Sequence, residues 1–211
     1  TEYSKRFAEN GTTAIIGTGS APGVMCVMAR KAVNELDECD TIACMVYEGT
    51  RTKRFIPFFW SPEVALCDME EDAYAFVNGE HVRTKPFSHP IKRNWPECGR
   101  EVTLVEHAHD EPVYIGFNRE KYFKGCKNAF FKYGGTGIEV SEGLYKAGLL
   151  HHTSEMFEGH EIVPFDWVLK HIPAAPKDPD VIKDIIAEGI VEDNGAFVCE
   201  AYGKKNGKDV M

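Results

Sequence analysis

The sequence predicts an α+β fold built around an antiparallel or mixed sheet. An early strand-helix-strand pattern ends at residues 41–47, and no further β-α repeat follows it. Hairpin signals appear instead: Asn-Gly at 78–79 and again at 206–207 follows a run with strand character, and this dipeptide is the strongest short hairpin signal. A doubly wound fold would keep alternating strands and helices, so the hairpins favour the mixed or antiparallel sheet.

The N-terminal part supplies that single β-α-β pattern. Residues 1–12 have the character of the end of an amphipathic helix, closed by a glycine. The apolar run over 14–16 predicts a buried strand, and the glycine-rich turn over 17–23 leads into a helix that reaches about Leu36. A glycine-rich turn before a helix presents free backbone N–H groups, which makes it a candidate phosphate-binding turn.

Two interpretations of this turn compete. In the first, it binds the pyrophosphate of a dinucleotide, and Glu48 binds the ribose. Its glycines, however, read G-x-G-x-x-x-G, one residue too long for the dinucleotide fingerprint, and Pro22 removes a backbone donor. In the second interpretation, the turn joins two domains. The absence of a third β-α repeat favours the second.

The middle of the chain predicts short elements. Ser61-Pro62-Glu63 is a strong helix start, with a capping serine, a proline at the first helical position and an acid in the first turn. Irregular chain with three prolines is expected over 85–100. Strands are predicted over residues 73–77, 80–84, 101–109 and 113–117, and a short helix or turn over 118–124.

The last third of the chain also predicts short elements. The first is a strand that ends at the glycines of Gly134-Gly135-Thr136-Gly137. Strands are predicted over 128–133, 161–163, 190–192 and 196–202, and helices over 141–147, 164–170 and 180–188. The final hairpin has a short second strand. We therefore expect both ends of the sequence to be cuts in a longer chain.

Composition excludes several classes of protein. With 211 residues and an apolar fraction of 43%, the chain is long enough for a substantial core. A formal charge of −9 argues against a nucleic-acid-binding surface. The sequence shows no signal peptide and no apolar run long enough to cross a membrane, so we expect a cytoplasmic protein with no membrane partner.

Cysteine and histidine patterns do not predict a metal site. The seven cysteines include no C-x-x-C pair, which predicts free thiols in a reducing compartment. His107 and His109 would share one face of a strand, but no third ligand has a clear spacing, so no metal is predicted. His89, His107 and His109 are candidates for acid–base chemistry near neutral pH.

Six short motifs are spread over nearly the whole chain: G-S-A-P-G at 19–23, W-S-P at 60–62, Y-A-F-V-N-G-E at 74–80, F-K-Y-G at 131–134, Y-K-A-G-L-L at 145–150, and V-P-F-D at 163–166 with Ile-Pro at 172–173. In this order they resemble the segment after the nucleotide-binding domain in the saccharopine dehydrogenase-like family, which includes saccharopine, carboxynorspermidine and lysine dehydrogenases. The family's turn often has Asp where Ala21 stands.

The resemblance implies a fold and a domain role. It implies a mixed, largely antiparallel sheet with helices packed mainly on one face, like the C-terminal domains of dihydrodipicolinate reductase and glyceraldehyde-phosphate dehydrogenase. Residues 1–211 would form a single substrate-binding and dimerisation domain. An N-terminal Rossmann domain and a final return segment would lie outside them. The parent protein would be a homodimeric NAD(P)-dependent oxidoreductase acting on an amino acid or imine C–N bond.

The resemblance also implies site residues. Lys132, where relatives carry Arg or Lys, would bind a substrate carboxylate beside Tyr133, and Trp60 and Ser61 would line the cleft. Gly19, Pro22 and Gly23 would approach the nicotinamide of NAD or NADP. Each of these residues also has a purely structural interpretation. The lysine could be a solvated surface residue and the tyrosine a core residue. The serine could be a helix cap beside a packing tryptophan, and the glycines and proline could form a plain turn. A non-catalytic dimerisation or ligand-binding module, and a complete small Rossmann enzyme, remain alternative functions.

Overall fold

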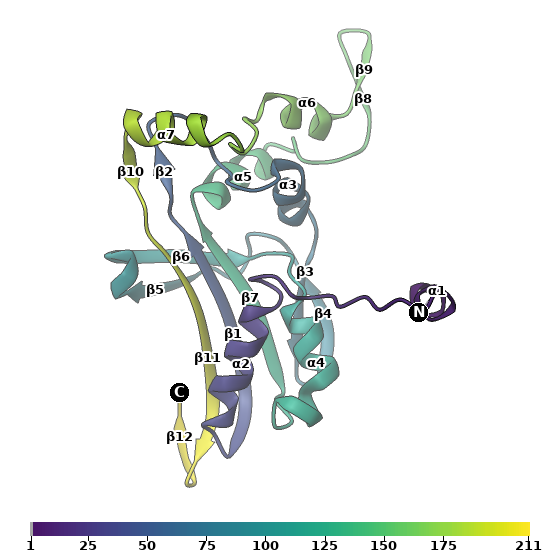
Figure 1. Ribbon diagram of the computed structural model, residues 1–211, viewed down its shortest axis with the longest axis vertical. Coiled ribbons are helices and arrows are strands. Elements are labelled where there is room, and N and C mark those ends of the chain that lie inside the picture. Colours follow the sequence, from purple (N-terminus) through teal and green to yellow (C-terminus); the bar gives the residue numbers. More distant parts are fainter. Residues whose placement is uncertain (1) are drawn as a thin grey trace.

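The computed structural model describes residues 2–211 and is built around an eight-stranded sheet (Figure 1). Its central strand is β1 (Glu38–Glu48). β1 pairs in antiparallel with β11 (Gly195–Lys205), which forms a hairpin with β12 (Lys208–Val210). On its other side β1 pairs in parallel with β7 (Asn128–Gly135). Residues 42–47 of β1 are all buried, as expected for an apolar strand covered on both faces.

The far edge of β7 is shared between two hairpins. β3 (Ala73–Val77) pairs with the first half of β7, and β4 (Glu80–Thr84) completes that hairpin. β6 (Arg100–Glu106) pairs with the second half of β7, and β5 (Ile91–Trp95) pairs with the other edge of β6. All of these pairings are antiparallel except β1 with β7. The predicted α+β fold with a mixed, largely antiparallel sheet is confirmed.

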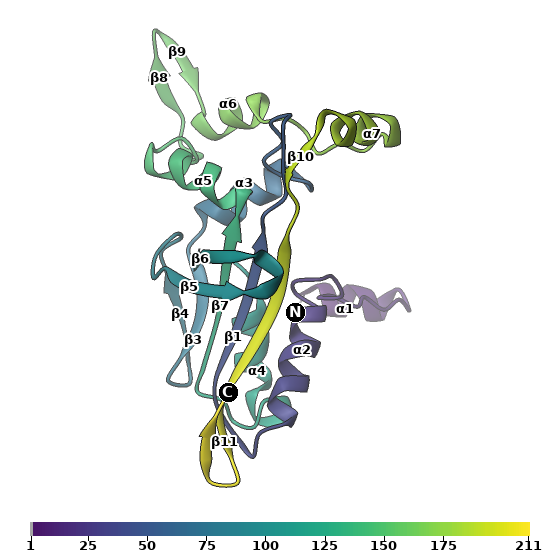
Figure 2. The same cartoon turned by 90° about the vertical axis from the view of Figure 1, so that its left-hand side faces the viewer.

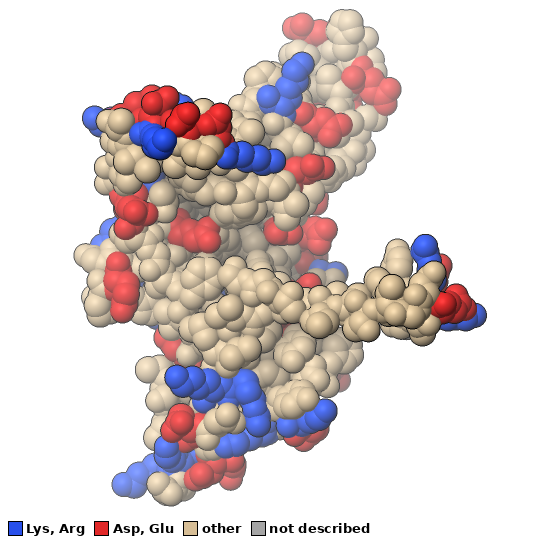
Figure 3. All heavy atoms as spheres, viewed as in Figure 1, with Lys and Arg blue, Asp and Glu red and all other residues tan. Residues whose placement is uncertain are grey.

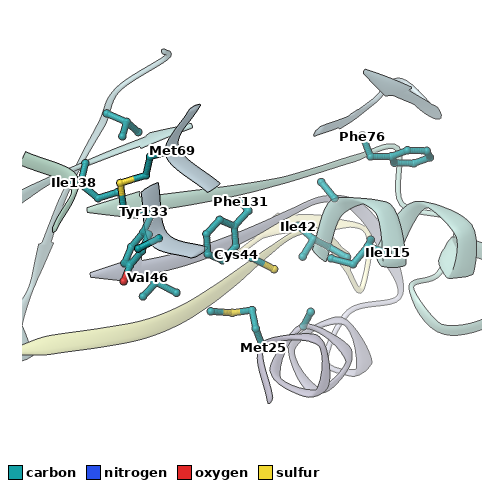
Figure 4. Packing of buried hydrophobic residues seen from close by; sticks show 14 of the residues in the cluster. Met25, Ile42, Cys44, Val46, Met69, Phe76, Ile115, Phe131, Tyr133 and Ile138 are labelled. Atoms are coloured by element: carbon teal, nitrogen blue, oxygen red, sulfur yellow. The ribbon is translucent and has the colours of Figure 1, made fainter. Parts of the chain in front are cut away.

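Helices α2 (Val24–Asn34) and α4 (Glu111–Tyr122) cover one face of this sheet. Figure 4 shows Met25 of α2 and Ile115 of α4 close to Ile42 and Cys44 of β1. The opposite face is covered by the β5–β6 hairpin, which crosses β1 and β11 (Figure 2) and forms a second core cluster. Helices therefore lie mainly on one face, as the resemblance implied.

A smaller layer lies beyond the carboxyl ends of β1 and β7 (Figure 1). Helices α3 and α5 contact one another there, and a two-stranded ribbon of β2 and β10 continues past them. The elements of this layer are α3 (Pro62–Glu70), α5 (Thr136–Lys146), α6 (Pro164–His171), α7 (Pro179–Glu188), β2 (Arg51–Thr52), β8 (Glu155–Phe157), β9 (His160–Ile162) and β10 (Ile190–Glu192). A short 3₁₀ turn, Pro96–Cys98, joins β5 to β6.

The predicted strand over 14–16 is wrong. α1 (Glu2–Glu9) forms the expected helix, but the residues after it are extended chain outside any strand. Ile15 and Ile16 are 78% and 89% exposed. A strand needs a neighbour for its backbone hydrogen bonds, and within residues 2–211 nothing pairs with this run. The β-α-β unit expected at the start of the chain is therefore absent from the described residues.

Three other boundaries also differ from the prediction. Residues 113–117 are helical, because Pro112 is compatible with the first turn of α4 and the buried Ile115 packs against the sheet. β5 lies inside the stretch expected to be irregular. α5 begins at Thr136, directly after β7, and not at Ser141. In each case tertiary packing outweighed local preference. Within residues 2–211, each helix falls short of the length and apolarity that crossing a bilayer requires.

Candidate functional site

Two adjoining cavities lie at the carboxyl ends of β1 and β7. Their volumes are about 490 and 330 Å³, and both are lined by Glu48, Trp60, Tyr133 and Phe197. Figure 3 shows a hollow between the upper helical layer and the body of the sheet, with acidic side chains at its rim. The carboxyl ends of neighbouring parallel strands are where open sheets usually bind ligands. The only parallel pair of the main sheet in the described chain thus positions the candidate site.

The first polar pair of the site joins the two parallel strands. The Tyr133 hydroxyl donates a hydrogen bond to the Glu48 carboxylate. Burial raises the pKa of Glu48, although this hydrogen bond opposes the rise. Burial and the Glu48 charge also raise the pKa of Tyr133, so the phenol stays protonated and remains a donor. The Trp60 ring stacks against Tyr133, with centroids 6.3 Å apart.

The second polar pair consists of Asp68 on α3 and His109 before α4, which line the smaller cavity. Burial raises the pKa of Asp68 to about 6, and the nearby His109 moderates the rise. The His109 ring stacks on Phe131 with centroids 4.0 Å apart, and its Nδ1 lies 2.9 Å from Oε2 of Glu111. An acid with a pKa near neutrality, beside an imidazole, is suited to proton transfer.

His107 completes the wall of the smaller cavity. Its ring lies edge-on to Tyr133, with centroids 4.9 Å apart, and 5.3 Å from the ring of His109. Burial, with a contribution from His109, holds the pKa of His107 well below its usual range. His107 is therefore neutral at physiological pH. Across residues 2–211, no three His, Cys, Asp or Glu side chains are placed to hold a metal ion, and all seven cysteines are free thiols.

The structure brings two of the four predicted substrate residues together, Trp60 and Tyr133. Ser61 caps α3: its Oγ accepts a hydrogen bond from the backbone N–H of Val64 at 3.4 Å. Lys132 lies on the other face of β7 and is 5% exposed as a side chain. Its Nζ donates to Oε1 of Glu106 and to the carbonyl of His89, each at 2.7 Å.

The glycine-rich turn lies at the edge of the same site. Ser20 and Ala21 line the smaller cavity, and Pro22 lines a third, polar pocket that also includes Asp68 and His109. The turn closes on itself, since the N–H of Gly19 donates to the carbonyl of Pro22 at 3.0 Å. A Cβ on Gly23 would lie 2.1 Å from the Gly19 carbonyl oxygen, so this position requires glycine.

Sequence reasoning missed two carboxylates that contribute most to the chemistry of the site, the half-buried Asp68 and the buried Glu111. Asp68 is one of several acids on a short helix, and Glu111 is one of two before a proline. No local pattern separates a buried acid from an exposed one, because burial depends on what packs against it. Glu48 stands out in the sequence only as a possible ribose ligand. Its position at the end of an apolar strand is the one available signal.

Comparison with known proteins identifies relatives over part of the chain. No protein-family profile matches. The carboxynorspermidine synthase of Vibrio alginolyticus is 33% identical over 137 residues, which cover 62% of this chain and 33% of that protein. This similarity supports a relationship of the chain to the saccharopine dehydrogenase-like family. The Vibrio cholerae carboxynorspermidine synthase is 28% identical over a segment of the same length.

The chain spans about a third of the length of these curated relatives. Among solved structures, the apo form of histidine-tagged saccharopine dehydrogenase (L-glutamate forming) from Saccharomyces cerevisiae matches with a TM-score of 0.47 and 12% identity. That match covers 79% of this chain and 43% of the yeast chain.

The half-buried Asp68 should make stability depend on pH. Its folded pKa of about 6 exceeds the ordinary value of 3.8, so the stabilisation that its protonated form provides is complete below about pH 4 and is lost as the pH rises through 6. Asp68→Asn removes this loss. Relative to the wild type, the variant should gain about 1–2 kcal/mol between pH 4 and pH 7, after discounting for partial solvation.

Urea unfolding at several pH values measures this gain. Glu63→Gln, at an exposed acid in the same helix, controls for the loss of one charge. A stability difference between wild type and Asp68→Asn that stays flat across this pH range would show that the Asp68 carboxyl is not desolvated.

Proposed function

We propose that this chain is the substrate-binding and dimerisation domain of an NAD(P)-dependent oxidoreductase that acts on the C–N bond of an amino acid or imine. The observation that carries the proposal is the convergence of the Glu48–Tyr133 and Asp68–His109 pairs at one cavity, beside the glycine-rich turn. The relationship to carboxynorspermidine synthases supports the reaction class. A cytoplasmic homodimer is part of the proposal.

The cavity supplies the groups that such a reaction requires. Oxidation of an amine transfers a hydride from carbon to the nicotinamide, and the nitrogen must also lose a proton. In this proposal the carboxylates of Glu48 and Asp68 attract the cationic amine, and Trp60 packs against its carbon chain. The Asp68–His109 pair takes the proton, because the pKa of Asp68 lies close to working pH.

The nicotinamide end of the cofactor is assigned to the turn at Gly19, Pro22 and Gly23. Ser20 and Ala21 of this turn already line the cavity, so a ring bound there faces the substrate. The turn lacks the dinucleotide fingerprint and does not follow a strand, so it does not fit the pyrophosphate. We therefore assign the rest of the cofactor to a Rossmann domain outside residues 1–211. Bound there, the nicotinamide would accept or donate the hydride.

The test is an assay of the full-length protein that contains this chain. Nicotinamide absorbance is followed with lysine, saccharopine and polyamine-derived imines, and Asp68→Asn should lower kcat about 10²-fold on the active substrate. Glu63→Gln, outside the cavities, should leave kcat unchanged. Cofactor binding without turnover on any substrate would favour the alternative, a non-catalytic module of the same ancestry. Sedimentation velocity reports whether the protein is a dimer.

A further inference from the structure

The orientation of His109 depends on one buried carboxylate. Glu111 is 0% exposed, and its Oε2 lies 2.9 Å from Nδ1 of His109. Phe131 fixes the plane of the imidazole, because the two rings stack at an interplanar angle of 12°. Because both the plane of the ring and one of its edges are fixed, the His109 side chain has a single orientation. His109 is therefore preorganised before any ligand binds.

This contact assigns chemical roles to the two ring nitrogens. A carboxylate only accepts hydrogen bonds, so Nδ1 carries the hydrogen and the neutral ring has its lone pair on Nε2. The His109 side chain is 17% exposed, whereas Glu111 is fully buried. The exposed edge is thus the one away from Glu111. His109 lines both the smaller cavity and the outer polar pocket, so the edge opposite Glu111, which carries Nε2, is the one available to face them.

We propose that Glu111 is a positioning residue that fixes His109 as the Nδ1–H tautomer and turns the basic Nε2 toward the cavity. The N–H bond of the substrate ammonium breaks, its electron pair stays on the amine, and a new N–H bond forms at Nε2. The resulting imidazolium is stabilised by Glu111 and Asp68, and it releases the proton to water through the outer pocket. Only the identity of the proton donor rests on the proposed function.

Several other charged or titratable groups surround His109. Asp68 and Glu71 face it from α3 and the end of that helix, and Asp110 borders the same outer pocket. From the sheet side the neighbours are Glu48 and the neutral His107. Of the carboxylates, only Glu111 is hydrogen-bonded to the ring in the described chain. Tautomer choice is therefore assigned to Glu111, and the other acids contribute only at longer range.

The test is the imidazole ¹⁵N spectrum of the chain at a pH where His109 is neutral, assigned by comparison with His109→Gln. Wild type should show the Nδ1–H pattern, which is the minor tautomer of free histidine. Glu111→Met has similar volume and no acceptor, so the tautomer ratio should shift about tenfold or more toward Nε2–H. Glu71→Met, at an exposed acid of the outer pocket, should leave the ratio unchanged.

An Nε2–H pattern in the wild type would overturn the inference, and this measurement needs no variant to fold. An unchanged ratio in Glu111→Met would overturn it as well. These outcomes do not depend on turnover. A protein with no oxidoreductase activity but with the Nδ1–H pattern would refute the proposed function and leave the tautomer assignment standing.

Discussion

Replacing Gly135 with alanine should destabilise the fold by about 4 kcal/mol or more, an effect at the upper end of those seen for single substitutions. Gly135 is the last residue of β7, opposite Glu48 in the parallel pair. Its φ is +124°, where a side chain is strained. A Cβ there would lie 1.9 Å from the Glu48 carbonyl oxygen and 2.5 Å from its carbonyl carbon.

Relaxation cannot easily remove this clash. The obstructing atoms belong to the backbone of β1, so the two central strands would have to separate at the end that carries the site. Such a movement would also displace the Glu48 side chain from Tyr133. The variant should therefore lose both stability and the Glu48–Tyr133 hydrogen bond.

Gly143→Ala is the matched control for this prediction. Gly143 lies within α5 and is exposed, and a Cβ added to it would meet no atom within 4 Å. Alanine should stabilise the helix there by about 0.5–1 kcal/mol. Urea unfolding measures the free energy of unfolding of both variants, and the comparison is valid if their m-values match that of the wild type. A Gly135→Ala variant within about 1 kcal/mol of Gly143→Ala would contradict the strand-closure argument.

The sequence was informative wherever a structure has a local cause. Asn-Gly at 78–79 and 206–207 predicted both hairpins correctly, because the dipeptide itself adopts the turn. Ser61 predicted the start of α3 in the same way. The pairing of β1 with β7 has no local cause. It joins strands from distant parts of the chain, and only packing of both faces selects it.

The residues of the candidate site also divide into those that a local sequence pattern predicts and those that depend on long-range packing. Trp60 and Tyr133 were predicted from short motifs and do line one cavity. Asp68 and Glu111 owe their chemistry to burial by distant elements, which no local pattern records. Strand geometry offered one further inference: neighbouring residues on a strand point to opposite faces, so Lys132 and Tyr133 do not share a cavity.

Lys132→Met should destabilise the protein by about 3–5 kcal/mol, because it leaves a buried charge without its partner. Lys132 and Glu106 are 5% and 6% exposed as side chains, and the Nζ–Oε1 distance is 2.7 Å. Oε2 of Glu106 has no hydrogen-bond partner among the described residues. Without the lysine, the glutamate must either remain charged in an apolar setting or take up a proton, and both cost free energy.

The double variant Lys132→Met, Glu106→Leu separates a structural role from substrate binding. Replacing both members of a buried ion pair by apolar residues of similar volume is often neutral, so stability should return to near the wild-type value. Lys132 also donates a hydrogen bond to the His89 carbonyl, which the double variant lacks. If this hydrogen bond contributes independently, part of the loss in stability will remain. A single variant as stable as wild type would show that the pair is solvated.

Activity of the stable double variant then decides between the two interpretations of Lys132. The sequence resemblance assigned this lysine to a substrate carboxylate, whereas the structure pairs it with Glu106 across the sheet from Tyr133. If Lys132 binds substrate, the double variant should fold normally yet raise KM about tenfold or more, because a charged hydrogen bond to the ligand is lost. If the pair is structural, KM and kcat should both stay near the wild-type values once stability is restored.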